Sequence, residues 1–477
     1  MSFLLGGATS PATSSGTWEP FTQAEADAEG GRSFTHRRHA DGRWHPSVIR
    51  HSLCRGGVGG TDVNVEHEVG TVGIASGFDP FSLEYLADPY PHLAQARDST
   101  PAFYSRAVDH WVVTRYDDIR RVLLAPAVFS AANALAPLTP PCPAAARTLS
   151  GYGAVPTLAD ADPPAHTRAR RMVNGAFTPR RVSAMEPVVR AVVARFCDER
   201  LRLGHADIIR DFAWDLPVIV LFSILGAPAE DVPQVKESSA NRVLFTYGKP
   251  SAEEQVRAAE GLFALWGYAR ALVEDRICDP RDDFTTDLVQ ARDAQGEGLS
   301  VAEASTITLS LLVAGHETTT SLLGNAFRRL LEHRGAWEQL CADPSLIPGA
   351  VEEVLRLDSP VVAWRRRTTQ PVNIGGVAVP EGADLLLMLG SANRDPAKFP
   401  DPDVFDICRP NAHQHLSFGF GAHFCLGASL ARLEARIVLE EVSARLPSLR
   451  LVAGQPLEFL PNVSFRGPLS LCVEWDI

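Results

Sequence analysis

The stretch 418–427 constrains this chain more than any other, because it combines three glycines with one cysteine directly ahead of a predicted helix. It reads Phe-Gly-Phe-Gly-Ala-His-Phe-Cys-Leu-Gly, and the amphipathic segment 428–436 follows it. The glycines permit a tight backbone path with positive φ and let a flat ligand lie against the main chain. Cys425 would face the unpaired amides and the positive dipole end of the helix, which favours the thiolate. The stretch therefore predicts a cysteine that holds negative charge.

A second pattern lies inside a long predicted helix, residues 300–334. There the sequence Ala-Gly-His-Glu-Thr-Thr-Thr occupies positions 314–320. Glycine and consecutive threonines are poor helix formers, so their place in mid-helix indicates a purpose. Gly315 leaves room for a small ligand, and Glu317 with the hydroxyl of Thr318 can relay protons from water. We assign no role to the histidine at position 316, which we expect to face away.

Two further pairs become informative only beside these patterns. His166 and Arg170 follow an Asp-Pro helix start and share one helix face. An exposed basic helix is the alternative interpretation. Glu353 and Arg356 lie three residues apart on another predicted helix, and such a pair contributes little when it is at the surface.

The cysteine stretch resembles the haem-binding loop of the cytochrome P450 family, whose pattern is Phe-x-x-Gly-x-His-x-Cys-x-Gly. The matching positions are Phe418, Gly421, His423, Cys425 and Gly427. The resemblance implies that Cys425 is the axial thiolate ligand of haem b (iron-protoporphyrin IX). Thiolate ligation pushes electron density onto the iron and favours cleavage of the O–O bond.

Two alternatives for the cysteine stay open. Cys425 could be a buried structural cysteine, since free cysteines are among the most buried residues. It could also ligate zinc together with His413, His415 and His423, although these spacings do not match the usual paired ligand pattern.

The other family motifs occur in the expected order, and the resemblance assigns roles to them. The implied catalytic residues are Glu317 and Thr318. The implied cofactor-binding residues are His166, Arg170, Ala314, Gly315, Arg366, Phe418, Gly419, His423, Cys425 and Gly427, with Arg365 and Arg367 as neighbours that could replace Arg366. The implied structural residues are Glu353, Arg356 and Arg409, and the implied substrate-pocket residues are Val361, Val362 and Trp364.

The resemblance also implies the fold: mainly α with small β-sheets, a triangular prism of helices around a buried haem. We expect one catalytic domain over residues 77–477. Residues 1–76 are rich in small and polar residues without periodicity, which predicts a disordered extension. Residues 131–160 are expected to form a loop over the substrate. Helices over 228–249 and 251–276 are expected to form a lid.

The implied function is NAD(P)H-driven monooxygenation of a small hydrophobic or aromatic substrate by O2, as hydroxylation or as O- or N-dealkylation. The chain resembles the haem domains of self-sufficient bacterial members but contains no Gly-x-Gly-x-x-Gly nucleotide loop and no iron–sulfur cysteine set after position 450. We therefore expect a separate ferredoxin or flavodoxin with an NAD(P)H reductase, docking near Arg432 and Arg436. A peroxide-driven peroxygenase and a non-catalytic haem-binding protein are the alternatives.

Bulk properties restrict the partners. The formal net charge of −12 argues against nonspecific binding of nucleic acid. The eight cysteines are scattered without paired spacing, which is typical of a reducing cytoplasm. No segment approaches the roughly 20 apolar residues of a membrane helix. We expect a soluble, cytoplasmic protein without a membrane or nucleic-acid partner.

Overall fold

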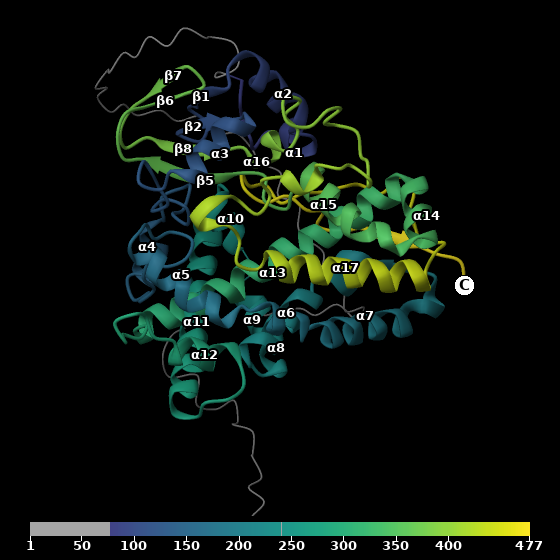
Figure 1. Ribbon diagram of the computed structural model, residues 1–477, viewed down its shortest axis with the longest axis horizontal. Coiled ribbons are helices and arrows are strands. Elements are labelled where there is room, and N and C mark those ends of the chain that lie inside the picture. Colours follow the sequence, from purple (N-terminus) through teal and green to yellow (C-terminus); the bar gives the residue numbers. More distant parts are fainter. Residues whose placement is uncertain (1–76, 240) are drawn as a thin grey trace, which may run out of the picture. The chain divides into compact units, whose positions relative to one another are not determined.

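The computed structural model describes residues 77–239 and 241–477, and its elements are drawn in Figure 1. The extension 1–76, predicted to be disordered, lies outside the described residues. Helices dominate, and three small sheets accompany them, as the predicted fold class requires. Within the described part of the chain, no helix is both long and apolar enough to cross a membrane.

The first part of the described chain carries short helices and a hairpin. Its elements are α1 (Leu83–Ala87), α2 (Tyr90–Ser99), β1 (Ala102–Ser105), β2 (His110–Val113), α3 (Tyr116–Leu124), β3 (Phe129–Ser130) and α4 (Pro143–Leu149).

The middle of the chain is a helical layer with one short strand. It contains α5 (Ala165–Ala176), α6 (Pro179–Ser183), α7 (Glu186–Arg200), β4 (His205–Asp207), α8 (Leu216–Leu225), α9 (Val232–Ser239), α10 (Arg242–Tyr247), α11 (Ala252–Cys278), α12 (Phe284–Gln290), α13 (Val301–Glu332), α14 (Arg334–Ala342) and α15 (Ile347–Leu357).

The last part returns to the main sheet and ends beyond the cysteine loop. It contains β5 (Trp364–Thr368), β6 (Val372–Ile374), β7 (Val377–Val379), β8 (Asp384–Leu387), α16 (Leu389–Ala392), α17 (Ala428–Arg445), β9 (Arg450–Leu451) and β10 (Cys472–Glu474).

The main sheet has the strand order β1-β2-β8-β5-β3, with β2 and β8 parallel and the other pairs antiparallel. Strands β4, β10 and β9 form a second sheet, and β6 with β7 forms a third. The main sheet lies beside α2, α3 and α16, while the long helices α13 and α17 run together through the helical layer (Figure 1). This arrangement brings β5 of the sheet close to the segments that carry the sequence motifs.

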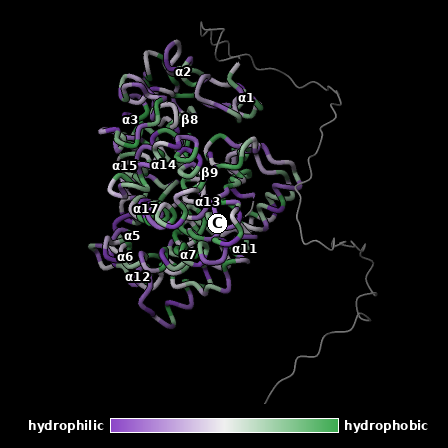
Figure 2. Tube along the Cα trace, turned by 90° about the vertical axis from the view of Figure 1, so that its right-hand side faces the viewer, coloured by the Kyte–Doolittle hydropathy of each residue, from purple (hydrophilic) through white to green (hydrophobic). Residues whose placement is uncertain are grey.

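The long helix α13 confirms the helix expected over 300–334. It begins with a capping box, in which Ser300 accepts from the amide of Glu303 and the Glu303 carboxylate accepts from the amide of Ser300. Leu312, Leu323 and Phe327 bury its apolar face in a core shared with α7, α8 and α17. Apolar and polar segments alternate along most helices, as in Figure 2, which is typical of helices with one buried face.

Two expectations, for residues 131–160 and 228–249, were wrong in part. The segment 131–160 is not loop throughout, because α4 begins at Pro143 and continues through three alanines. Proline at the first helical position and alanine after it are strong helix signals. The helix expected over 228–249 is interrupted, since Asn241 has a φ of 69° between α9 and α10.

The three residues implied to be structural lie together in the core. Glu353 and Arg356 are both 0% exposed, and the guanidinium donates to both carboxylate oxygens at 2.7 and 2.8 Å. Arg409 donates to the same carboxylate at 3.1 Å. Arg356 also donates to the carbonyl oxygens of Asn393 and Pro402. The network ties α15 to the segment that leads into the cysteine loop.

Candidate functional site

A cavity of about 280 Å³ lies between the middle of α13, the cysteine loop, the start of α17 and strand β5. Most of its wall is apolar, and it is the place where the predicted motifs meet. Segments more than 250 positions apart, from Arg170 to Gly427, contribute to it. Concave, mainly apolar sites with a few polar groups are typical of ligand and cofactor pockets.

The cysteine loop is held by its own backbone and needs its glycines for different reasons. The amide of Cys425 donates to the carbonyl oxygen of Phe418 at 2.9 Å. Gly419 and Gly421 have φ values of 69° and 72°, and a Cβ on Gly421 would lie 2.8 Å from the carbonyl oxygen of Leu123. Gly427 has an ordinary φ of −81°, contrary to the sequence expectation. Its missing Cβ leaves open space on the cavity wall, where a flat ligand fits.

The thiol of Cys425 lines the cavity at the start of α17. Burial raises its thiol pKa, while the amides of Gly427 and Ala428 and the charge of Arg170 act in the opposite direction. The helix start therefore favours the thiolate, as predicted, but protein groups alone do not outweigh burial. A cation at the sulfur would supply the missing stabilisation.

The zinc alternative is contradicted by the geometry. Within residues 77–239 and 241–477, no group of three or more His, Cys, Asp or Glu side chains is arranged to hold a metal ion. His415 faces Glu352 at 3.4 Å, and the Nδ1 of His423 lies 3.1 Å from the carbonyl oxygen of Leu158.

The middle of α13 forms another wall of the cavity, to which Ala314, Gly315, Glu317 and Thr318 contribute. The hydroxyl of Thr318 donates to the carbonyl oxygen of Ala314 at 2.8 Å. Burial raises the pKa of Glu317 to about 7, although the charge of Arg242 acts against it. A carboxyl group with this pKa exchanges protons readily near neutral pH.

The histidine that follows Gly315 faces away from the cavity, as expected. His316 is buried against Trp214, and its Nε2 lies 3.0 Å from the carbonyl oxygen of that residue. Burial lowers the pKa of His316 to about 4, so it stays neutral.

Cationic and imidazole groups gather beside the cysteine loop and form no ion pair with the described residues, although the charge of Asp162 acts on several of them. The rings of His166 and His423 lie with centroids 4.0 Å apart. Both ring nitrogens of His166 and the Nε2 of His423 are buried without a hydrogen-bond partner in the described chain. Arg170 and Arg366 lie on the adjoining cavity wall. Such orphaned groups fit the two carboxylates of a haem, which would accept hydrogen bonds from them.

The strand β5 decides between three consecutive arginines. Trp364 and Arg366 alternate with their neighbours and both line the cavity. Arg365 instead donates to the carbonyl oxygen of Ala134 at 3.0 Å. Arg367 pairs with the Asp384 carboxylate at 2.7 and 3.0 Å. Of the three, Arg366 is therefore the one placed to meet a cofactor.

One of the three expected pocket residues is placed elsewhere. Val361 and Trp364 line the cavity, but Val362 does not. Its amide donates to the carbonyl oxygen of Ser464 at 2.7 Å, and its side chain packs against Gly390. In extended chain, neighbouring side chains point to opposite faces, so Val361 and Val362 could not both face the substrate.

Sequence reasoning missed two charged residues of the cavity wall. Glu434 on α17 is 2% exposed, its Oε2 has no partner among the described residues, and burial raises its pKa to about 8. Its position on the apolar side of an amphipathic helix is the signal that could have identified it. Arg242, the first residue of α10, also lines the cavity. It lies in a region without a motif, and only the fold brings it to the site.

Comparisons with known proteins agree with this geometry. The sequence model of the family described as Cytochrome P450 matches residues 270–444. The chain is 37% identical over 404 residues to cytochrome P450 monooxygenase PikC of Streptomyces venezuelae, covering 82% of this chain and 92% of that protein. The solved structure of cytochrome P450 CREJ in complex with (4-ethylphenyl) dihydrogen phosphate has a TM-score of 0.81 at 41% identity, covering 84% of this chain and all of that chain.

An intact type IV self-sufficient cytochrome P450 monooxygenase is similar as well, with a TM-score of 0.81 and 41% identity. The match covers 84% of this chain but 53% of that one. The resemblance to self-sufficient members therefore extends over about half of their length. The fold is mainly helical, and the residues of the predicted motifs line one cavity. Together with these features, the similarities show that the chain belongs to the cytochrome P450 family of haem-dependent monooxygenases.

Proposed function

We propose that this protein inserts one oxygen atom from O2 into a small hydrophobic or aromatic substrate, by hydroxylation or by O- or N-dealkylation. The observation that carries the proposal is that Cys425 and the pair Glu317–Thr318 line one cavity whose remaining wall is mainly apolar. A thiol for the cofactor, groups that move protons and a dry space for a substrate are thus combined in a single site.

The residues of this cavity have complementary tasks toward haem. Cys425 would supply the thiolate ligand, and His166, Arg170, Arg366 and His423 would hold the carboxylates. Ala314, Gly315, Phe418, Gly419 and Gly427 would lie against the ring. When bound, haem supplies the redox chemistry that activates O2.

The protein itself supplies the protons. With a pKa of about 7, the Glu317 carboxyl can take a proton from water and pass it on at neutral pH. The Thr318 hydroxyl can accept that proton's hydrogen bond while its own proton is directed to Ala314. The apolar wall around them excludes bulk water, which limits unproductive proton leakage.

Oxygen labelling separates this proposal from the peroxygenase alternative. With 18O2, NAD(P)H and an electron-transfer system, a hydroxylated product should carry one labelled oxygen. After dealkylation, the label should be in the carbonyl oxygen of the aldehyde or ketone that is released. Turnover with hydrogen peroxide alone, at a rate that Glu317→Gln leaves unchanged, would instead support the peroxygenase. Haem binding without product under either condition would support a non-catalytic haem protein.

The electron donor is proposed to be a separate ferredoxin or flavodoxin with an NAD(P)H reductase, but its expected docking residues do not present free charge. Arg432 pairs with Glu352 at 2.6 Å, and Arg436 pairs with Glu440 at 2.6 Å. Arg120 on α3 is the better candidate, because it is exposed and its guanidinium lies 4.7 Å from the ring centre of Phe420 in the cysteine loop.

The docking proposal can be tested by charge reversal. Arg120→Glu should slow reduction by an acidic carrier and weaken the salt dependence of that rate. Arg257→Glu, at an exposed position on α11, is the matched control. Equal rates in the two variants would exclude Arg120 as a docking residue.

The apolar wall supports an aromatic or otherwise hydrophobic substrate, as does the aryl phosphate bound to CREJ. We also propose a cytoplasmic location, because the seven cysteines of the described chain are free and scattered.

A further inference from the structure

Arg242 is a charged residue of the cavity wall that the proposed mechanism leaves without a task. Its guanidinium forms no hydrogen bond or ion pair with the residues that the structure describes, yet it lines the same cavity as Cys425 and Glu317. Arg242 is half-buried, and the part of its guanidinium that faces this apolar wall loses water unless an anion or a hydrogen-bond acceptor replaces it. The position therefore suits an anionic partner that enters the cavity.

The carboxylates of haem do not account for Arg242. Arg170 and Arg366 have neighbours at the cysteine end: the charge of Arg170 acts on Cys425, and that of Arg366 acts on His166 and His423. Arg242 belongs to a different group of side chains. Its charge acts on Glu317, Tyr152 and Tyr247, where burial raises each pKa and Arg242 opposes the rise.

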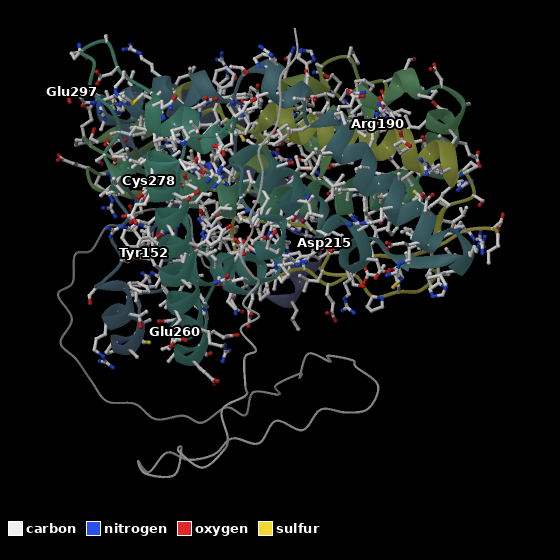
Figure 3. The ribbon with its side chains drawn as sticks, turned by 90° about the horizontal axis from the view of Figure 1, so that it is seen from below. Tyr152, Arg190, Asp215, Glu260, Cys278 and Glu297 are labelled. Carbon is white, nitrogen blue, oxygen red and sulfur yellow. The ribbon has the colours of Figure 1, made fainter. Side chains whose placement is uncertain are left out.

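Arg242 and Tyr247 place this group of side chains on the α10 side of the cavity. Tyr247 is the last residue of α10 and lines the cavity. Tyr152 packs against Trp266 of α11 with ring centroids 6.3 Å apart, and it lies beside that long helix in Figure 3. We call this α10 side the roof of the cavity; among the described residues, neither Tyr152 nor any residue of α11 lines it.

The helix that carries Arg242 is fixed over the cavity by contacts at its other end. The amide of Leu138 donates to the carbonyl oxygen of Thr246 at 3.0 Å, and the amide of Val463 donates to that of Tyr247 at 3.0 Å. Thr139 donates to the carbonyl oxygen of Gly248 at 3.3 Å. Two separate segments therefore hold α10 in place.

Glu317 is the acidic residue on whose pKa the charge of Arg242 acts, but it is not a permanent ion-pair partner of Arg242. The two residues form no ion pair, and burial keeps a large fraction of the Glu317 carboxyl neutral around pH 7. Because Glu317 forms no ion pair with it, the Arg242 guanidinium is open to an anion from solution. The wall of the same cavity also includes Leu135, Leu221, Leu311 and Phe465, which can accept an apolar body.

We propose that Arg242 binds an anionic group of the substrate, so that the protein acts on organic oxyanions with an apolar or aromatic body. The proposal rests on the proposed function, since it names the substrate class of the same cavity. The arginine fork donates two parallel hydrogen bonds to a carboxylate or a phosphate ester. Holding that group under the roof directs the apolar end of the molecule toward the cysteine side, where the reaction occurs.

Calorimetric titration of the haem-bound protein tests the proposal without turnover. The probes share one body: neutral 4-ethylphenol, 4-ethylbenzoate and 4-ethylphenyl phosphate. In the unmodified protein at least one anion should bind roughly 10- to 100-fold more tightly than the phenol, which is the range of a hydrogen bond to a charged group. A preference for the benzoate alone or for the phosphate alone identifies which oxyanion fits. Equal affinity for all three probes would overturn the proposal.

Substitutions of Arg242 test whether this residue causes the preference for anionic probes. The ratio of neutral to anionic Kd should fall to about one in Arg242→Gln and persist in part in Arg242→Lys, which keeps the charge but loses the planar fork. Arg257→Gln, an exposed arginine on α11, should keep the full ratio. A full ratio in Arg242→Gln would contradict the proposal.

A second variant separates substrate binding from simple neutralisation of Glu317. If Arg242 recognises an anion, Glu317→Gln should keep or increase the anion preference, because a competing carboxylate is removed. Loss of the preference in Glu317→Gln would show that the pair acts as a unit and would overturn the proposal. These titrations measure binding and need no product. The proposed substrate class can therefore fail while the oxygen-labelling experiment succeeds, and the proposed oxygen insertion can fail while the anion preference is observed.

Discussion

The rings of His166 and His423 are in contact, with centroids 4.0 Å apart and an angle of 31° between their planes. They come from distant parts of the chain, the start of α5 and the cysteine loop. His166 is 1% exposed, and neither of its ring nitrogens has a partner in the described residues. Because buried polar groups are normally satisfied, we propose that a haem carboxylate binds at this contact.

Replacing His166 by Phe should weaken haem retention, since the ring shape remains while the hydrogen-bond donor is lost. The loss of one charge-assisted hydrogen bond should accelerate haem transfer to an acceptor protein by roughly 10-fold. The measurement is the rate of absorbance change during transfer. His92→Phe, at a partly exposed position on α2, is the control. Equal transfer rates in the two variants would contradict a role for His166 in haem binding.

Glu317 should control the pH dependence of turnover. Burial raises its pKa to about 7, so its protonated form is present below that pH and is lost above it. Product formation should therefore fall as pH rises through about 7. Glu317→Gln should lower the rate roughly 100-fold and remove this dependence. The check is kcat between pH 6 and 8.5.

The control for Glu317 is Glu260→Gln, at the exposed surface of α11 and labelled in Figure 3. It should retain both the rate and the pH profile. An unchanged profile in Glu317→Gln would exclude this carboxyl as the proton donor.

Asp358 should be a main determinant of stability in acid. Its carboxylate is buried and bonded to Arg328, Arg329 and Arg394. Although burial alone would raise its pKa, these arginines hold the pKa well below its ordinary value. The stabilisation is therefore present above the unfolded-state pKa and is lost as pH falls toward the folded-state value.

Asp358→Asn should destabilise the fold by about 3–5 kcal/mol at pH 7, because it removes the buried carboxylate that three arginines share and leaves them with the more exposed Glu332 and Asp403. Urea unfolding at pH 7 and below pH 3 measures the effect, which should be smaller at the lower pH, because that pH lies below the unfolded-state pKa. Asp282→Asn, at a fully exposed carboxylate, should change stability little. A loss below 1 kcal/mol in Asp358→Asn would contradict this interpretation.

Gly421→Ala should disturb the cysteine loop. The residue has a φ of 72°, and an added Cβ would lie 2.8 Å from the carbonyl oxygen of Leu123. Positive φ alone costs an alanine roughly 1–2 kcal/mol, and the close contact adds to this cost. Thermal unfolding and haem content should both fall. Gly335→Ala, in α14 with open space around it, should be neutral or stabilising.

Local patterns in the sequence were sufficient for the elements whose signals are strong. The helix over 300–334 carries a capping box and a periodic apolar face, and the glycines of 418–427 specify a loop of their own. The pairing of Glu353 with Arg356 and Arg409, which the structure shows, was implied by the family resemblance, because the spacing alone is uninformative.

What the sequence could not reveal depends on tertiary packing. Arg242 reaches the cavity because α10 is fastened to segments more than 100 positions away, which no local pattern records. The choice of Arg366 among three arginines required the register of β5, and the exclusion of Val362 from the cavity required its contacts with Ser464 and Gly390. The pairing of Arg432 with Glu352 likewise depends on how α17 packs against α15.

The central claim is that Cys425 ligates haem through its sulfur. The most direct measurement is the absorption spectrum of the reduced protein exposed to carbon monoxide, recorded beside Cys425→Ala. We predict a strongly red-shifted Soret band in the parent protein that is absent from the variant, because a thiolate ligand donates more electron density to the iron than a neutral one. A colourless protein, or a spectrum that is the same in both proteins, would contradict the account.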